Sequence, residues 1–325
     1  MNIIKKCVSK SYFPALLLLV IFTGINAIMN HGLTLSFFKF FLLTNAPALC
    51  VAIGVSATII IAGTDISLGS IVSLVNVVII TLAGKGFSVP AAAFTALAVA
   101  VACGMVNGVI IGIFRVNPLL TTFATSTIFA GIALWILPNP GGSVDYSFAE
   151  WYMGNQLGFI LTPVALILLL CLIWFVAIKT PLGLKLYALG CDEKKAYASG
   201  VKVGAIRFLA HTYAGLAAGI AGICITANTC SGSPTIGASM SLNSIASAVI
   251  GGISLNGGIG TIGGGLLGAA FLSILTNIVV AAKLSSYVQS FVQGLILLIG
   301  VILSIVAGDK EIKSKFRGLF KKGVA

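Results

Sequence analysis

Long apolar stretches separated by short polar gaps make up most of this chain, and within them apolar and polar residues do not alternate. About 20 apolar residues let an α-helix cross a bilayer, whereas a strand of a membrane barrel needs alternation. Because backbone groups in lipid must be satisfied within the structure, each stretch is predicted to be a helix. The pattern predicts about ten membrane-spanning helices, over residues 12–30, 41–62, 66–84, 91–114, 119–138, 160–178, 207–228, 240–254, 259–281 and 287–307.

The composition favours lipid as the solvent for most of the surface. Of the 325 residues, 58% are hydrophobic and 8% are charged, against about 25% charged residues in a typical soluble domain. The net charge of +12 is compatible with a nucleic-acid partner, but the basic residues lie in the gaps between apolar stretches rather than on one face. We therefore expect an all-α integral membrane protein surrounded by a lipid bilayer, with no nucleic acid as partner.

The basic residues also predict an orientation. If the amino terminus is inside and the chain crosses ten times, sixteen lysines and arginines fall inside and three fall outside. Lysine and arginine are enriched in cytoplasmic loops, so this sorting predicts cytoplasmic amino and carboxyl termini. The carboxyl-terminal segment, residues 308–325, is then a basic cytoplasmic tail. The three outside residues are Lys39, Lys85 and Lys283.

The first apolar stretch has two interpretations. Lys5, Lys6 and Lys10 precede it, and a secretory signal peptide has the same order of charged and apolar regions. The stretch is long for a signal peptide, and no convincing small-x-small cleavage site follows it. A retained first helix is therefore favoured, and cleavage would leave the orientation of the other spans unchanged.

Two connections are longer than the others. The outer one, residues 139–159, contains Trp151 and Tyr152, which suit a membrane interface and a short amphipathic element. The inner one, residues 179–206, holds a dense cluster of polar residues. Within it, a helix is predicted to start after one glycine and stop at the next, over residues 190–200.

No catalytic or cofactor-binding motif stands out. The chain has no GxxxxGK[ST] phosphate-binding loop, and no catalytic constellation or metal-ligand cluster is recognisable, so neither catalytic nor metal-binding residues are assigned. Asp65 is the only one of seven acidic residues outside the predicted loops and tail. It is either a functional carboxylate within the membrane or an N-cap of the third helix, and these two roles are compatible.

The other polar residues predicted within the membrane are neutral. Such side chains can line a passage for a neutral polar solute through hydrogen bonds, or they can join neighbouring helices. With Asp65 and its neighbours, the candidates for a translocation path or a structural motif are Thr64, Asp65, Ser67, Asn76, Asn107, Thr121, Thr122, Asn243 and Asn277.

Four segments together resemble one transporter family. Residues 62–70, AGTDISLGS, resemble a GGIDLSVGS-type signature, and residues 115–122, RVNPLLTT, resemble an R-V-x-P-F-I-x-T segment. Residues 180–201 are similar to a T-x-x-G…A-x-G cytoplasmic loop, and residues 250–268 to a late I-G-G-T-S-L-x-G-G segment. In this order, they resemble the permeases of ribose/galactose/xylose-type ABC importers, within the branched-chain amino acid/ribose superfamily.

The resemblance implies a type II ABC importer-like permease that forms one transmembrane domain over residues 1–325. Such a permease pairs with a second copy or a paralogue in the bacterial inner membrane. A separate ATPase subunit binds ATP and Mg, and an extracytoplasmic binding protein delivers a monosaccharide such as ribose, galactose or xylose. The inner connection, residues 179–206, would be the coupling loop. Its matching residues are Gly183, Gly190, Asp192, Ala196, Ala198, Ser199 and Gly200.

Two departures from the family pattern concern the partners and the solute. Asp192 stands where the family often has asparagine, and Ser241 to Ala246 lack the acidic residues that many relatives carry, so the sugar is not implied. One alternative is an ion-coupled secondary transporter, which the shortage of carboxylates within the membrane argues against. A membrane-embedded enzyme or scaffold is a further alternative without a supporting motif.

Overall fold

The fold was examined in a computed structural model. It describes residues 12–29, 32, 34–156, 160–283, 285, 287, 288, 290–292, 294, 295 and 298. The helices are α2 (Phe13–Met29), α3 (Leu35–Ile60), α4 (Leu68–Gly84), α5 (Val89–Gly112), α6 (Pro118–Ile136), α7 (Ser147–Met153), α8 (Thr162–Lys179), α9 (Pro181–Cys191), α10 (Glu193–Ala198), α11 (Val203–Thr229), α12 (Met240–Ile250) and α13 (Ile262–Ala281). Two short antiparallel ladders pair β1 (Gly141–Ser143) with β4 (Ser231–Gly232) and β2 (Asn155–Gln156) with β3 (Ile160–Leu161).

The helices follow the predicted apolar stretches. Within the described residues, six helices are long and apolar enough to cross a membrane, namely α3, α5, α6, α8, α11 and α13. The shorter helices α2, α4 and α12 are also apolar and coincide with three further predicted spans. The all-α, multi-pass architecture is thus confirmed. The tenth predicted span and the basic tail fall largely or wholly outside the described residues, and the number of crossings and the side of the termini stay predictions.

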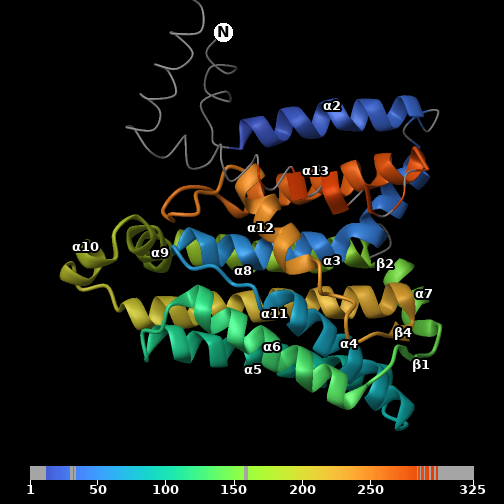
Figure 1. The fold of residues 1–325 in the computed structure, drawn as a ribbon, viewed down its shortest axis with the longest axis horizontal. Helices are drawn as coiled ribbons and strands as arrows, with labels where there is room; N and C mark the ends of the chain where they lie inside the picture. The colour runs from blue at the N-terminus through green and yellow to red at the C-terminus, as the bar shows by residue number, and fades with distance from the viewer. Residues whose placement is uncertain are drawn as a thin grey trace, which may run out of the picture.

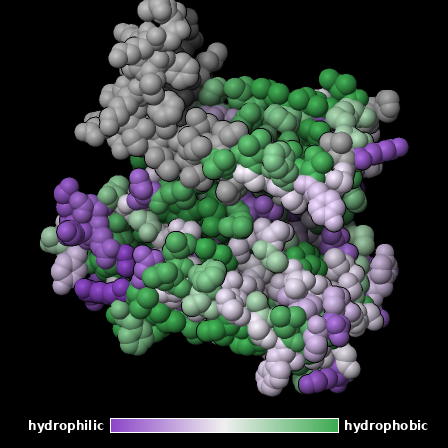
Figure 2. Space-filling model, viewed as in Figure 1, coloured by the Kyte–Doolittle hydropathy of each residue, from purple (hydrophilic) through white to green (hydrophobic). Residues whose placement is uncertain are grey.

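The helices lie side by side along the long axis of the molecule, with different structures at its two ends (Figure 1). Helices α9 and α10 form one end, and α7 with the ladder of β1 and β4 lies at the other. Hydrophobic residues cover much of the surface between the ends, and hydrophilic residues gather over α9 and α10 (Figure 2). This distribution suits a bilayer around the middle of the molecule, with α9 and α10 in water.

Helix α11 lies at the centre and packs against α3, α4 and α5. Its contact with α5 depends on glycines, since a Cβ added to Gly215 would lie 2.6 Å from the carbonyl oxygen of Ala100. Small residues let membrane helices approach at backbone distance, where dispersion contacts replace the missing hydrophobic driving force. Glycines on both helices therefore allow this close packing of α5 and α11.

Helices α4 and α12, of 17 and 11 residues, begin next to each other. Their starts are tied together by Ser241 of α12, whose Oγ donates to the carbonyl of Ile66 at 2.6 Å and accepts from the N–H of Gly69 at 2.9 Å. The N–H of Gly237 donates to Ser73 Oγ at 2.9 Å. Irregular backbone at membrane depth is tolerated only inside protein or along a cavity, and Ser67 and Leu68 at the start of α4 are fully buried.

In the outer connection, residues 139–159, the two aromatic residues Trp151 and Tyr152 have different surroundings. A short helix, α7, forms as predicted, and Trp151 is 42% exposed. Tyr152 does not lie at an interface, because it is fully buried and its hydroxyl donates to the carbonyl of Leu43 at 2.7 Å. Pro47 inside α3 has no N–H to pair with that carbonyl, so Tyr152 satisfies it instead.

Candidate functional site

Residues 61–67 connect α3 to α4, and this connection is termed the break. Helix α3 ends in a left-handed turn: Ala62 has φ +57°, its N–H donates to Ile59 O at 2.9 Å, and the N–H of Gly63 donates to Thr58 O at 2.9 Å. This is the hydrogen-bond pattern of a Schellman cap, in which glycine usually holds the left-handed position. The cap ends α3, and the segment that follows it contains the buried residues Gly63, Asp65 and Ser67.

Asp65 lies in the middle of the break and is fully buried. Its Oδ1 accepts from the N–H of Ser67 at 2.9 Å and from Ser67 Oγ at 2.6 Å. Its Oδ2 lies 2.9 Å from Nδ1 of His211 on α11. The N-cap interpretation is wrong in position, because Ser67 is the N-cap of α4. Asp65 stabilises the turn before the helix, and it joins that turn to α11.

Further side chains hold the break from the other helices around it. Thr122 of α6 donates from Oγ1 to the carbonyl of Thr64 and accepts from the N–H of Ile66, both at 3.2 Å. Asn107 of α5 donates from Nδ2 to Ser67 Oγ at 2.8 Å. With His211 and Ser241, these contacts make the break the meeting point of α5, α6, α11 and α12.

Three buried polar atoms near the break have no hydrogen-bond partner in the described part of the chain: His211 Nε2, Asn107 Oδ1 and Thr121 Oγ1. An unmade bond at a buried polar atom costs about 1–3 kcal/mol. The candidate residues predicted from the sequence do not include His211, although it is the only histidine inside a predicted apolar stretch. Its pairing with Asp65 over 146 positions has no local signal.

Asn76 serves a different connection. Its Nδ2 donates to Thr226 Oγ1 at 2.9 Å and to the carbonyl of Ser231 at 3.0 Å, and its Oδ1 accepts from the N–H of Ser233 at 2.7 Å. These bonds tie α4 to α11 and to the β4 segment. Little hydrogen-bonding capacity of Asn76 is left for a solute. Asn277 of α13 is only half-buried.

The inner connection forms two short helices. Helix α10 starts after Asp192 and is followed by Gly200, with φ +80°, so the predicted helix is present. Asp192 caps it by accepting the N–H of Lys195 at 3.1 Å. This backbone hydrogen bond, with the Lys195 ammonium 3.1 Å away, holds the pKa of Asp192 below its ordinary value. Among the other candidate residues of the inner connection, Gly183 and Ala196 are buried, whereas Ala198 and Ser199 are exposed.

Gly190 brings the inner connection into backbone contact with two distant segments. A Cβ added at Gly190 would clash with the carbonyl oxygen of Ile60 and lie 2.5 Å from the N–H nitrogen of Gly258. That N–H donates to Ile60 O at 2.9 Å, and Tyr187 of α9 donates to the carbonyl of Gly260 at 2.9 Å. Helix α9 is therefore seated directly on the end of α3, where the break begins, and on the segment before α13.

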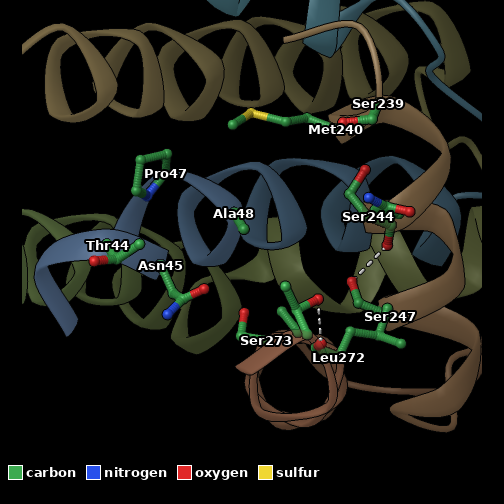
Figure 3. Close-up of a pocket in the computed structure, with 13 residues that line it drawn as sticks. Thr44, Asn45, Pro47, Ala48, Ser239, Met240, Ser244, Ser247, Leu272 and Ser273 are labelled. Carbon is green, nitrogen blue, oxygen red and sulfur yellow. Dashed lines mark hydrogen bonds between the residues drawn. The ribbon is translucent and has the colours of Figure 1, made fainter. Parts of the chain in front are cut away.

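A cavity of about 210 Å³ opens between α3, α12 and α13, and eight of its thirteen lining residues are polar (Figure 3). Asn243 lines it, whereas Asn277 does not. Sequence reasoning missed the other polar members because they come from three helices that are separate in the sequence. The polar lining residues are Thr44, Asn45, Ser239, Asn243, Ser244, Ser247, Ser273 and Thr276.

The known proteins that this chain resembles in sequence include permeases of import systems. The family model described as branched-chain amino acid transport system / permease component matches residues 36–301. The ribose import permease protein RbsC of Bacillus subtilis (strain 168) is 33% identical over 256 residues, which are 78% of this chain and 80% of that protein. The ribose import permease protein RbsC of Escherichia coli (strain K12) is 34% identical over 260 residues, 78% of this chain and 80% of that protein.

A permease named for a different solute is also similar to this chain. The autoinducer 2 import system permease protein LsrC of Photorhabdus luminescens is 30% identical over 253 residues, 76% of this chain and 75% of that protein. No solved structure gives a significant match.

Proposed function

This chain belongs to the branched-chain amino acid transport system / permease component family, and we propose that it is the membrane-spanning subunit of an ATP-driven importer of a small sugar. Two relatives that match this chain over four-fifths of their own length are ribose import permeases. Ribose is therefore the first solute to test. The observation that carries the proposal is the seat of α9 on the end of α3 through Gly190.

In this proposal, α9 and α10 form the coupling element within residues 179–206. A separate ATPase subunit, which binds ATP and Mg, docks on them from the cytoplasm. Because Gly190 touches the backbone at both Ile60 and Gly258, a displacement of α9 is transmitted to two segments that lead into the membrane. The close contact leaves no slack that side-chain rotation could absorb.

The remaining parts of the importer are assigned by analogy with the family. The proposed assembly lies in the bacterial inner membrane, with both termini and the tail of residues 308–325 cytoplasmic. A second copy or a paralogue completes the pore, and an extracytoplasmic binding protein delivers the solute at the end where α7 lies. Residues 1–325 form a single transmembrane domain. Family membership favours this assembly over an ion-coupled carrier, which the buried pair of Asp65 and His211 would otherwise support.

The experiment is reconstitution of the full chain with its ATPase and binding protein in liposomes. We expect concentrative uptake of radiolabelled ribose or another monosaccharide only when hydrolysable ATP, the ATPase and the binding protein are all present. Concentrative uptake by the chain alone, or ATP-independent uptake that an ionophore abolishes, would overturn the proposal.

A further inference from the structure

The cavity lies in the half of the molecule away from α9. Thr44 is sixteen residues before Ile60 on α3, which is about 24 Å at 1.5 Å per residue. Leu43, next to Thr44, receives the hydroxyl of Tyr152 from α7. The cavity therefore lies toward the end where, under the proposed function, the solute arrives.

Four polar side chains of the cavity have no hydrogen bond to any described residue, and two of them, Thr44 and Ser239, are exposed. Ser273 of α13 is 6% exposed and Asn243 of α12 is half-buried, and both line the cavity. By contrast, Ser247 donates along its own helix to the carbonyl of Ser244 at 2.7 Å (Figure 3), and Ser244 donates to the carbonyl of Ser241 at 2.8 Å. Unsatisfied polar groups at membrane depth are costly, so the Asn243 and Ser273 side chains are available to hydrogen-bond water or a solute that enters the cavity.

The rest of the lining limits what that partner is. Among the described residues, the lining contains no charged side chain, so a zwitterion or an ion would leave its charges unpaired. Apolar surface alternates with the polar groups and comes from Pro47, Ala48, Met240 and Leu272. A monosaccharide has the matching chemistry, because hydroxyl groups project from a ring whose C–H faces are apolar.

The size of the cavity agrees with a small solute. Its volume of about 210 Å³ is more than ten times the ~10–15 Å³ that a cavity needs to hold one water. It is smaller than the ~300–1,000 Å³ of pockets for drug-sized ligands. A solute of about ten non-hydrogen atoms, such as a pentose, is of the right order.

We propose that the cavity between α3, α12 and α13 is a binding subsite for a neutral monosaccharide, and that the Asn243 amide and the Ser273 hydroxyl are its specificity-determining hydrogen-bonding groups. This inference rests on the proposed function and names a place along its solute path. Asn45 contributes an acceptor at the same wall, since its Nδ2 already donates to Phe41 O at 2.9 Å and its Oδ1 is left for a ligand.

The test uses the complete importer in liposomes and the initial rate of ATP-driven uptake of radiolabelled ribose. Asn243→Leu keeps a similar volume and removes both hydrogen-bonding functions, and Ser273→Ala removes the hydroxyl. Thr95→Val is the control, because its exposed hydroxyl donates within α5 at 2.8 Å, away from the cavity. We expect uptake at subsaturating ribose to fall about tenfold or more in Asn243→Leu and severalfold in Ser273→Ala. It should remain within twofold of wild type in Thr95→Val.

A second measurement covers the case in which Asn243→Leu fails to insert. In membranes that contain Asn243→Cys, a small neutral thiol reagent should modify the new cysteine, and saturating ribose should slow that modification at least threefold. Unchanged uptake in both cavity variants, or modification that ribose does not slow while the importer transports ribose, would overturn the subsite alone. Absence of ATP-driven uptake of any monosaccharide by the wild-type importer would instead overturn the proposed function. If the importer takes up the amino acid leucine, and Asn243→Leu abolishes that uptake, the assignment of the cavity to a neutral sugar would be contradicted.

Discussion

The break and the cavity contain the same kinds of side chain within the membrane, but they differ in what those side chains bond to. In the break, Thr122 and Ser241 each bond to two backbone groups of the segment they hold. In the cavity, Ser273 and Asn243 bond to no described residue. We infer that the break is a frame that fixes helices, whereas the cavity is a place for a solute. Neutral polar residues in a membrane helix therefore do not reveal their role by type.

The largest effect on stability is expected at Asp65. Asp65→Ala removes three hydrogen bonds and leaves His211 buried without its partner, which should lower the free energy of unfolding by about 3–5 kcal/mol. Asp145→Ala is a matched control, because Asp145 accepts the N–H of Ser147 at 2.8 Å in a similar turn on the surface. Thermal unfolding in detergent should separate the two variants clearly. Equal melting temperatures would remove Asp65 from the frame.

A smaller loss is expected at Thr122. Thr122→Val keeps the shape but unpairs the carbonyl of Thr64 and the N–H of Ile66, at a cost of about 1–3 kcal/mol. Thr127→Val, on the exposed face of the same helix, loses only an internal bond to Phe123 O at 3.2 Å. We expect it to change stability by less than about 0.5 kcal/mol. The assignment of Thr122 to the frame fails if both variants melt alike.

The cavity should behave in the opposite way. Ser273→Ala removes a buried hydroxyl that has no partner among the described residues, so stability should stay constant or rise by up to about 1 kcal/mol. Ribose uptake should nevertheless fall. A variant that unfolds as readily as Thr122→Val would show that Ser273 belongs to the frame.

The smallest effect is expected at Asp192, the aspartate in water at the start of α10. Its folded pKa is lowered by the N–H of Lys195. The stabilisation is thus present above the ordinary pKa of about 3.9 and is lost as the pH falls through the lowered folded value. Asp192→Asn should therefore melt slightly below wild type at pH 7, and the difference should vanish under more acidic conditions. A difference that persists or grows in acid would assign the cap a role independent of charge.

The hydrophobic pattern predicted the helices well because lipid requires continuous apolar segments with internal hydrogen bonds. It placed the start of α3 too late, at residue 41, since Lys39 interrupts the apolar stretch although Thr34 caps the helix by accepting the N–H of Phe37. The capped helix after Asp192 was predictable from glycine and aspartate alone, because capping is a local effect.

The candidate site was predictable only in part. Asp65 stood out as the one acidic residue outside the predicted loops and tail, but its pairing with His211 depends on the packing of α3 and α4 against α11. The cavity joins Thr44, Asn243 and Ser273 from three helices, and no local pattern marks such a meeting. The role of Gly190 likewise depends on contacts with Ile60 and Gly258.

The central claim, that α9 transmits the work of the ATPase through Gly190, has a direct test. In the reconstituted importer, ribose uptake is measured together with ATP hydrolysis for Gly190→Ala and for Gly131→Ala, where an added Cβ meets nothing within 4 Å. Overlap in a packed contact costs about 1–3 kcal/mol, so ribose imported per ATP hydrolysed should fall roughly tenfold in Gly190→Ala. ATP hydrolysis itself should continue, and Gly131→Ala should match wild type. An unchanged ratio of uptake to hydrolysis in Gly190→Ala would contradict this account.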